Sequence, residues 1–498
     1  MGTPVHAVVK QATDMTITDM TITDMTITDT ALYFLPVRCE RLLGFGGAAV
    51  ESVVCARVAV TVSSSDGKSA TGWGEVPLNV HWAWPAGGAG VPGTPGTPGT
   101  PGAADAAGDD REQRMMSYCV ELAKSLKVFS GKGHPLDISL RFMQEMGIPV
   151  GGVAVASLPP LAAVVCMAPF DLALYDAYGR LHNVGAFDVL TERWMNHDLG
   201  YYFGGDEVFR GRYPGEWLNK HPVTRLGVWH LVGYLDPLQA ADGGGSGEVS
   251  SRRMPASLQE WIRRDGLQYL KIKLGGTDLS ADCGRIGEIV DLVAADGGFG
   301  SNGIRALSVD FNGVPGDAGY VHDFFDWMER SYPNAYEHLL YVEEPLTSAL
   351  VHDRRAVTSL ARRKPLFMDE SAVWWTDVVR GRESGWSGVA LKTCKTLSGA
   401  LLSLCRAEEF GLPVMVQDLT NPMLAQLTHL AFASRVRTLY GVESNAMQFY
   451  PRASDPEAAV HPGAYCRREG TLDISTLRGA GFGYRLEEMK RDLPGRAA

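Results

Sequence analysis

Several features that often reveal a protein's function are missing from this sequence. Its eight cysteines are scattered singly, without any Cys-x-x-Cys pair, which argues against structural zinc and favours a reduced, cytoplasmic setting. The net charge of -11 leaves no basic patch for nucleic acid. No run approaches the ~20 apolar residues of a membrane helix, and no basic segment followed by an apolar one opens the chain. We therefore expect a soluble protein without nucleic-acid or membrane partners.

Two motifs with known chemistry are also missing. The twelve histidines include no His-Glu-x-x-His zinc motif. No Gly-x-Gly-x-x-Gly follows the first strand of the alternating part of the chain, which counts against a doubly wound dinucleotide-binding sheet, the second choice of fold. Lysines and carboxylates, in contrast, recur near the ends of successive apolar segments.

The domain organisation follows from length and composition. The 498 residues are 45% hydrophobic and 21% charged, an ordinary globular composition, and they exceed one typical core, so we expect two domains. Residues 1–30 contain a five-residue Thr-Asp-Met-Thr-Ile repeat that fits neither helix nor strand, and we predict a disordered leader. Residues 31–223 read as strands followed by helices, an α+β domain. Within it, residues 86–110 are rich in Pro, Gly and Thr and are predicted to be a disordered insertion.

Residues 224–450 alternate between apolar strands and helical segments. We count eight such strands, spaced by roughly 30 residues, which is the pattern of a (β/α)₈ barrel of ~250 residues. The predicted fold class is therefore α/β, a TIM-like barrel preceded by an N-terminal α+β domain. Active sites of such barrels lie at the C-terminal ends of the strands, so charged residues at those ends are the candidates for function.

Two lysines lie in the second barrel strand, within the apolar run 269–275. Because side chains alternate across a strand, Lys271 and Lys273 point to the same face. Two ammonium groups on one buried face repel each other and lose hydration, which is costly unless anions lie nearby. A frayed strand end, from which both lysines reach solvent, is the structural alternative. Carboxylates elsewhere in the barrel would decide between the two interpretations.

Carboxylates stand at the ends of the next three strands, at Asp310, Glu343 and Asp369, and Lys392 ends the sixth strand. A single acidic residue at a strand end is usually a helix cap or a loop residue. Three carboxylates converging in a barrel mouth would repel each other unless a cation lies among them. Hard oxygen ligands favour one Mg²⁺ ion, with Mn²⁺ as the alternative.

The motifs around these residues resemble those of the enolase superfamily. They are Lys-Ile-Lys on the second strand, Val-Asp-Phe-Asn on the third, Val-Glu-Glu-Pro-Leu on the fourth, Met-Asp-Glu-Ser on the fifth and Leu-Lys-Thr-Cys-Lys on the sixth. The pattern is most similar to the mandelate racemase/muconate lactonizing enzyme family, in its muconate lactonizing enzyme-like subgroup. The resemblance implies that the first domain caps the barrel and that residues 451–498 return to this capping domain.

The resemblance also implies roles for the charged residues. The metal ligands would be Asp310, Glu343 and Asp369. Lys273 and Lys392 would be the acid and base on opposite faces of the substrate, and Lys271 would assist Lys273 or touch the substrate carboxylate. A lysine must be neutral to act as a base, and a nearby metal ion and second lysine can lower its pKa. Enolase-type sites pair a Lys or His base with Mg²⁺ in just this way.

The expected reaction is Mg²⁺-dependent abstraction of a proton α to a substrate carboxylate, through a metal-stabilised enediolate. Two facing lysines favour a racemase, epimerase or cycloisomerase. An acid-sugar dehydratase is the alternative among enzymes, although it would more often carry a histidine base where Gln417 and Asp418 end the seventh strand. A non-catalytic ligand-binding relative is the alternative of another class. We expect a small carboxylate-bearing substrate and a homo-oligomer.

Other residues of the predicted mouth are weaker candidates. Glu344 and Glu370 follow ligand positions and, by strand alternation, are expected to face away and to play structural roles. His429 follows the seventh strand, but no His-Asp base pair is evident there. The candidates for substrate contacts are Asp418, Lys395, Asn312, Trp82, Trp84, Glu443 and Asn445.

Overall fold

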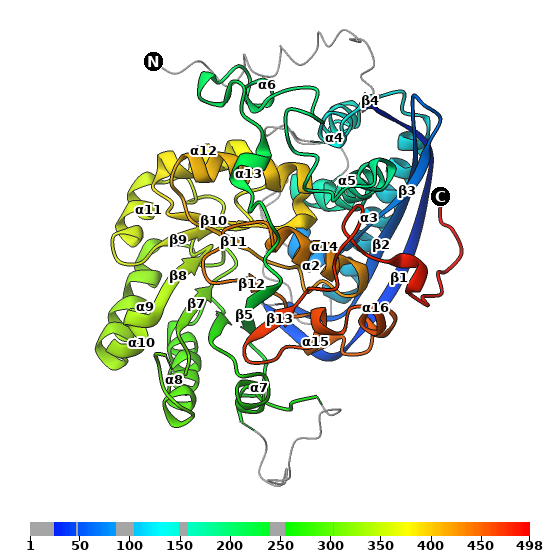
Figure 1. The fold of residues 1–498 in the computed structure, drawn as a ribbon. Coiled ribbons are helices and arrows are strands. Elements are labelled where there is room, and N and C mark those ends of the chain that lie inside the picture. Colours follow the sequence, from blue (N-terminus) through cyan, green and yellow to red (C-terminus); the bar gives the residue numbers. More distant parts are fainter. Residues whose placement is uncertain (1–23, 46–47, 86–103, 149–157, 240–253, 302) are drawn as a thin grey trace.

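The computed structural model places a four-stranded sheet and its helices beside a closed barrel (Figure 1). The sheet lies in the first part of the chain, drawn in blue, and the barrel begins in the green part. The structure describes residues 24–45, 48–85, 104–148, 158–239, 254–301 and 303–498.

The first sheet is antiparallel, with strand order β3-β2-β1-β4. Its strands are β1 (Met25–Phe45), β2 (Ala48–Ser64), β3 (Ser69–Pro77) and β4 (Lys132–Gly133). Helix α5 (Pro160–His182) packs so closely on β3 that a Cβ at Gly72 would lie 2.0 Å from the Ala177 nitrogen. Only glycine permits that approach. The other helices here are α2 (Val80–Ala83), α3 (Ala104–Val128), α4 (Pro135–Glu145) and α6 (Leu199–Tyr202), with short 3₁₀ turns η2 (Glu207–Phe209) and η3 (Pro214–Trp217).

Two expectations about disordered segments are wrong at their edges. Strand β1 begins at Met25, so residues 25–30 pair with β2 instead of belonging to the leader; Met25 and Ile27 alternate into the core, which explains the pairing. Helix α3 begins at Ala104, inside the segment 86–110, because the Pro-Gly-Thr repeat ends at Gly102 and alanine-rich sequence follows. Residues 1–23 and 86–103 lie outside the described residues.

One helix among the described residues is long and apolar enough to cross a membrane, contrary to the expectation from sequence. It is α5, with a mean hydropathy of 1.4 over its most apolar window, and that window is entirely buried inside the protein. Its residues pack against the first sheet on one side, and Asp171 contacts the barrel on the other. The apolar character of α5 is therefore that of a core helix between two layers.

Eight parallel strands close into a barrel in chain order, with β12 pairing back to β5. The predicted fold class, a (β/α)₈ barrel with an N-terminal α+β domain, is confirmed. The barrel strands are β5 (Arg225–Val232), β6 (Tyr269–Lys273), β7 (Ala306–Asp310), β8 (Leu339–Glu343), β9 (Leu366–Met368), β10 (Gly388–Leu391), β11 (Val414–Val416) and β12 (Val442–Glu443). A ninth strand, β13 (Thr471–Asp473), pairs antiparallel with β5 on the outside.

Helices surround the barrel, and several begin at an aspartate or serine whose side chain accepts a hydrogen bond from the first turn. They are α7 (Leu258–Asp265), α8 (Leu279–Ala295), α9 (Ala318–Ser331), α10 (Pro333–His338), α11 (Arg354–Ala361), α12 (Trp375–Ser384), α13 (Leu397–Glu409) and α14 (Met423–Ala433). Shorter pieces are η4 (Thr393–Lys395), α15 (Ala446–Phe449), α16 (Asp455–Val460), η5 (Pro462–Ala464) and η6 (Leu486–Glu488).

The C-terminal segment contacts the first sheet. Leu32 in β1 exchanges backbone hydrogen bonds with Ala497 and Ala498, at 2.8 and 3.1 Å. In the interior, the Arg57 guanidinium binds Glu75 of β3 and, at 3.0 Å, Glu457 of α16. These contacts accord with a tail that returns to the capping domain, while the residue at which each domain begins and ends stays a prediction.

Candidate active site

Inward-facing side chains fill the barrel in layers. The lower layer is a cluster of Trp229, Tyr269, Ala306, Tyr341, Phe367 and Met415, with Tyr341 and Phe367 stacked at 4.4 Å between ring centroids. Positions two residues further along each strand face the same way. The residue two after Tyr269 is Lys271, and those after Tyr341 and Phe367 are Glu343 and Asp369. Charged side chains therefore lie directly above an apolar floor, at the C-terminal end of the barrel.

Lys271 occupies the centre of this charged layer and is only 1% exposed. Its Nζ lies 2.7 Å from Glu343 Oε1, 3.0 Å from Glu443 Oε2 and 3.1 Å from Asp310 Oδ2. It also donates to Gln417 Oε1 at 3.3 Å. The interpretation of a frayed strand end is thus excluded for this lysine, because carboxylates from three other strands surround it.

The two lysines predicted as acid and base each contact a different carboxylate. Lys273 donates a hydrogen bond to Asp310 Oδ2, and Lys392 Nζ lies 2.8 Å from Asp369 Oδ2. Both lysines are more than nine-tenths buried. Strands β6 and β10 are four strands apart in an eight-stranded barrel, so the two lysines approach from opposite sides.

Lys395 differs from the other lysines because the hydrogen bonds of its ammonium group go to the segment after β9, while the Trp82 ring lies 5.7 Å away. Its Nζ donates to the Asp369 carbonyl at 2.5 Å, to Asp369 Oδ1 at 3.0 Å and to the Ala372 carbonyl at 3.1 Å. An ammonium group has three protons to donate. Lys395 therefore holds Asp369 in place in this structure, and its predicted contact with substrate stays a prediction.

Burial and charge shift the pKa values in this layer. Burial alone would raise the pKa of Asp310 and Asp369, but Lys273 and Lys392 respectively outweigh it and hold both values low. Burial raises the pKa of Glu343, and repulsion from Asp310 adds to this rise. Burial would lower the pKa of Lys392, yet Asp369 raises it overall. Burial and the neighbouring Asp310 carboxylate thus both act to raise the pKa of Glu343, while Lys271 acts to lower it.

The last two strands bring further predicted residues to the same layer. Glu443 Oε1 accepts from Asn445 Nδ2 at 3.2 Å, while Asn445 Oδ1 accepts from a β5 backbone nitrogen at 2.9 Å. Asp418 Oδ2 accepts from the Asn445 nitrogen at 2.9 Å, and the Asp418 carbonyl accepts from Lys392 at 3.4 Å. Burial, with Glu443 adding repulsion, raises the pKa of Asp418 to about 7.

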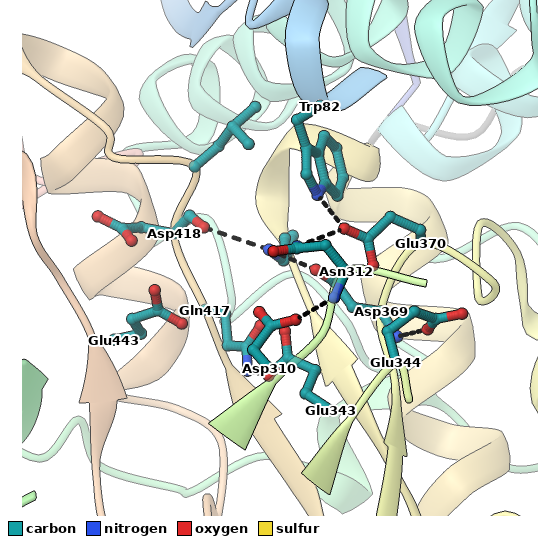
Figure 2. Close-up of polar contacts among 12 residues, drawn as sticks. Trp82, Asp310, Asn312, Glu343, Glu344, Asp369, Glu370, Gln417, Asp418 and Glu443 are labelled. Atoms are coloured by element: carbon teal, nitrogen blue, oxygen red, sulfur yellow. Dashed lines mark hydrogen bonds and ion pairs between the residues drawn. The ribbon is translucent and has the colours of Figure 1, made fainter. Parts of the chain in front are cut away.

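Helix α2 of the first domain lies over the mouth and brings one of its two tryptophans into the site. The Trp82 ring lies 4.8 Å from Lys392 Nζ, and its Nε1 donates to Glu370 Oε1 at 2.8 Å. Figure 2 shows the indole above the carboxylates. Trp84 instead packs under Arg114 at 4.8 Å, away from these lysines. The structure therefore brings Trp82, but not Trp84, to the charged layer.

Glu370 is the residue that the sequence interpretation placed wrongly. Its carboxylate accepts from Trp82 and, at 3.0 Å, from Asn312 Nδ2, so it faces the mouth and not away from it. Strand β9 ends at Met368, and alternation no longer applies to the residues that follow. Glu344 does face away: its Oε2 accepts from the Asp369 nitrogen at 2.7 Å and from Ser371, a structural contact.

Gln417 and His429 are two further polar residues close to the charged layer. Gln417 lies in the same layer, with its Nε2 donating to Glu343 Oε2 at 2.5 Å. Its position two residues after Met415, a member of the floor cluster, was the signal for this orientation. His429 is buried in α14, and its Nε2 bonds the Glu443 carbonyl at 2.7 Å. It therefore occupies a packing position, and no histidine base stands at the end of β11.

The donor set suits a hard divalent cation, although the carboxylates are engaged by lysines. Among the described residues, no three His, Cys, Asp or Glu side chains are gathered closely enough to hold a metal as they stand. All three carboxylates are fully buried, and Lys392 Nζ lies 2.8 Å from Asp369 Oδ2 while Lys271 Nζ lies 2.7 Å from Glu343 Oε1. The site therefore already gathers positive charge at the oxygens where a cation would bind. Oxygen ligands on three neighbouring strands fit Mg²⁺ or Mn²⁺, and flexible lysine side chains can move aside.

The fold and this layer define a class: a capped (β/α)₈ barrel whose mouth carries carboxylates on three successive strands between lysines on opposite sides. Residues 253–490 match the family model described as enolase C-terminal domain-like. The predicted likeness to the enolase superfamily, in its mandelate racemase/muconate lactonizing enzyme branch, is confirmed as a likeness by this match. Solved structures of an epimerase, a racemase and a cycloisomerase share this fold, in keeping with the expectation of an enzyme. No curated protein sequence matches the chain.

Solved structures share the whole architecture at low identity. A muconate lactonizing enzyme from Mucobacterium Smegmatis, complexed with muconolactone, is 17% identical with a TM-score of 0.59, covering 94% of this chain and 100% of that one. A dipeptide epimerase from Enterococcus faecalis, complexed with Mg and a dipeptide, is 14% identical with a TM-score of 0.58, covering 92% and 99%. An N-succinyl Arg/Lys racemase from Bacillus cereus is 15% identical with a TM-score of 0.58, covering 94% and 100%. At these identities the likeness shows the fold.

Proposed function

We propose that this protein is a Mg²⁺-dependent isomerase that removes a proton α to the carboxylate of a small substrate and returns it, as a racemase or epimerase does, or closes a ring, as a cycloisomerase does. The observation that carries this proposal is the pair of lysines on opposite strands. Lys273 on β6 and Lys392 at the end of β10 each contact a different carboxylate of the layer, Asp310 and Asp369. Two proton-transferring groups on opposite sides suit inversion at carbon.

The carboxylates between the lysines would hold the ion. Asp310, Glu343 and Asp369 supply oxygen donors, and a bound Mg²⁺ would supply positive charge to offset the charge that develops on the substrate carboxylate. Gln417 orients Glu343, and Lys395 orients Asp369 from the side. Such support keeps the ligands in place when the other lysines leave them.

The remaining side chains prepare the site for proton transfer. The carboxylates hold a proton on Lys392, because Asp369 raises the pKa of that lysine. Lys392 becomes a base only when other positive charge draws Asp369 away from it. Trp82 covers Lys392 and keeps water from it. The active form therefore needs both a loaded site and a closed cap.

Hydrogen exchange in deuterated water tests the assignment. The wild-type protein with Mg²⁺ is incubated with dipeptides, N-acyl amino acids and 2-hydroxy acids, and α-deuterium uptake is followed by NMR. Lys273→Ala is expected to abolish exchange of one enantiomer while retaining exchange of the other, and Lys392→Ala is expected to do the reverse. This pattern arises because each lysine serves one face.

Two outcomes would contradict the proposal. Absence of exchange in every wild-type incubation would refute proton abstraction and favour the ligand-binding relative. Exchange of both enantiomers in Lys273→Ala would show that this lysine is not the base. Acid-sugar dehydration remains the weaker enzyme candidate, since His429 is bonded to a backbone carbonyl and no histidine ends β11.

A further inference from the structure

The Glu370 carboxylate joins the cap to the barrel through only one of its oxygens. Oε1 accepts both the indole of Trp82, at 2.8 Å, and the side-chain amide of Asn312, at 3.0 Å. A carboxylate can only accept here, so Nδ2 is the atom of Asn312 that faces it and Oδ1 points elsewhere. The contact to the cap is thus complete without the second carboxylate oxygen.

That second oxygen, Glu370 Oε2, is shielded from solvent and has no hydrogen-bond donor. Asn312 Oδ1, on the side chain that binds Glu370 Oε1, is also buried without a hydrogen-bond partner. An unsatisfied buried acceptor is destabilising, more so when it is charged, and native proteins rarely leave one without a reason. Two such acceptors on bonded side chains of a candidate active site indicate a place for a donor that the chain itself does not supply.

The position of Glu370 connects this unpaired oxygen to the two lysines. Trp82, which donates to Glu370 Oε1, lies 4.8 Å from Lys392 Nζ. Asn312, which donates to the same oxygen, bonds Asp310 Oδ1 through its backbone nitrogen at 2.8 Å, and Asp310 in turn binds Lys273. Glu370 is therefore one residue removed from Lys392 and two from Lys273. A group that reaches Glu370 Oε2 lies near the atom on which those lysines would act.

We propose that Glu370 Oε2 accepts a hydrogen bond from an N–H or O–H group of the substrate, next to its carboxylate. This inference rests on the proposed function and narrows it. The substrates are N-acyl amino acids, peptides or 2-hydroxy acids, and diacids that have no such donor, as in muconate chemistry, are excluded. Glu370 is in this view a specificity-determining residue, held in position by Trp82 and Asn312.

Matched pairs of acids test the donor directly. Each N-acetyl amino acid is compared with its N-methyl counterpart, and each 2-hydroxy acid with its O-methyl ether, in wild type and in Glu370→Gln. The variant keeps an oxygen for Trp82 but places an NH₂ group where Oε2 stood. Both α-deuterium exchange and equilibrium binding by calorimetry are measured, so the result does not depend on turnover alone.

The wild-type protein is expected to prefer the donor-bearing acid of each active pair by about 10- to 100-fold, which is the cost of leaving the buried acceptor unpaired. Glu370→Gln is expected to reduce this preference at least tenfold, by weakening the donor-bearing acid and leaving its methylated partner within about threefold. Glu344→Gln is the matched control: the same change on the neighbouring carboxylate, which bonds only Asp369 and Ser371, leaves the preference intact.

The results separate this inference from the proposed function. Exchange that occurs equally with donor-bearing and methylated acids, or an equal loss for both in Glu370→Gln, overturns the inference and leaves proton abstraction standing. If no acid exchanges its α-hydrogen, the proposed function is wrong. The binding preference measured by calorimetry then shows whether Glu370 recognises the donor. The inference is wrong if neither acid of any pair binds. It is also wrong if Glu370→Gln binds the donor-bearing and the methylated acid as tightly as the wild-type protein does.

Discussion

Replacing Lys271 by methionine should weaken the metal-free protein and make its stability depend on Mg²⁺. Lys271 is 1% exposed and lies within 3.1 Å of carboxylates from Glu343, Glu443 and Asp310. Methionine preserves most of the volume but removes this cation from Glu343 and Glu443, while Asp310 keeps Lys273. Removing one partner of a buried ion pair costs about 3–5 kcal/mol. For a chain of this length, with an unfolding entropy of about 1 kcal/mol/K, the melting temperature should fall by about 3–5 °C.

Mg²⁺ should offset this loss, because the carboxylates freed by the substitution are the proposed ligands. An ion at 100 times its dissociation constant stabilises by about 2.7 kcal/mol. In the wild-type protein the ion must first displace Lys271, which offsets part of that gain. Mg²⁺ should therefore raise the melting temperature of Lys271→Met more than that of the wild-type protein. Differential scanning calorimetry with EDTA and with Mg²⁺ measures both effects. Lys124→Met, an exposed position on α3, is the control and should change neither.

The reasoning would be refuted by either of two results. If Lys271→Met melts with the wild-type protein in EDTA, the lysine does not neutralise the buried carboxylates. If Mg²⁺ raises the melting temperature of neither protein, Asp310 and Glu343 are not metal ligands. A gain from Mg²⁺ that is larger in the wild-type protein would show that Lys271 supports the ion instead of competing with it.

Two further predictions concern stability. Burial lowers the pKa of His134 to about 3. Below pH 6.5 the unfolded chain therefore binds a proton at this histidine that the folded chain does not bind. The free energy of unfolding should fall by about 2 kcal/mol between pH 6.5 and 5 for this reason. His134→Asn, which keeps a helix-capping acceptor, should lose this dependence in denaturant titrations at pH 7.5 and 5. Arg57→Met should cost about 3–5 kcal/mol by leaving Glu75 buried without its cation, while Glu457 keeps Arg491. Arg452→Met, in an exposed pair, should cost under about 1 kcal/mol, and equal losses in both variants would contradict the argument.

Strand periodicity was enough to predict the barrel because each strand repeats the same physical requirement. A strand that faces an apolar floor and a helical layer is apolar on both sides, and a charged residue marks its end. The prediction was wrong where composition concealed local pattern. Met25 and Ile27 alternate into the core although the repeat around them has a period of five. Helix α5 is 23 residues long, but Asp171 and Asp176 interrupt its apolar residues, so no continuous apolar run of membrane-spanning length stands out in the sequence.

Within the site, alternation predicted the residues inside strands and failed just beyond them. Lys271, Lys273, Asp310 and Glu343 lie on β-strands, and their common orientation follows from the two-residue period. Glu370 lies two residues past the end of β9, where a turn sets the direction of the side chain. Its partner Trp82 is 288 residues away in sequence, and no local pattern could have joined them.

The capping domain contributes to the site in more than one place, and so it cannot be a passive lid. Asp171 on α5 accepts hydrogen bonds from the backbone nitrogens of Leu397 and Ser398, at 2.6 and 3.1 Å, and so fixes the start of α13. That helix follows directly on η4, which carries Lys395. The same domain therefore anchors the end of the sixth-strand lysine segment through α5 and covers its lysines through Trp82 on α2. Because both contacts are buried, moving the cap would disturb the lysines as well as the entrance. In the proposed function, substrate selection and proton transfer would therefore be coupled through this interface.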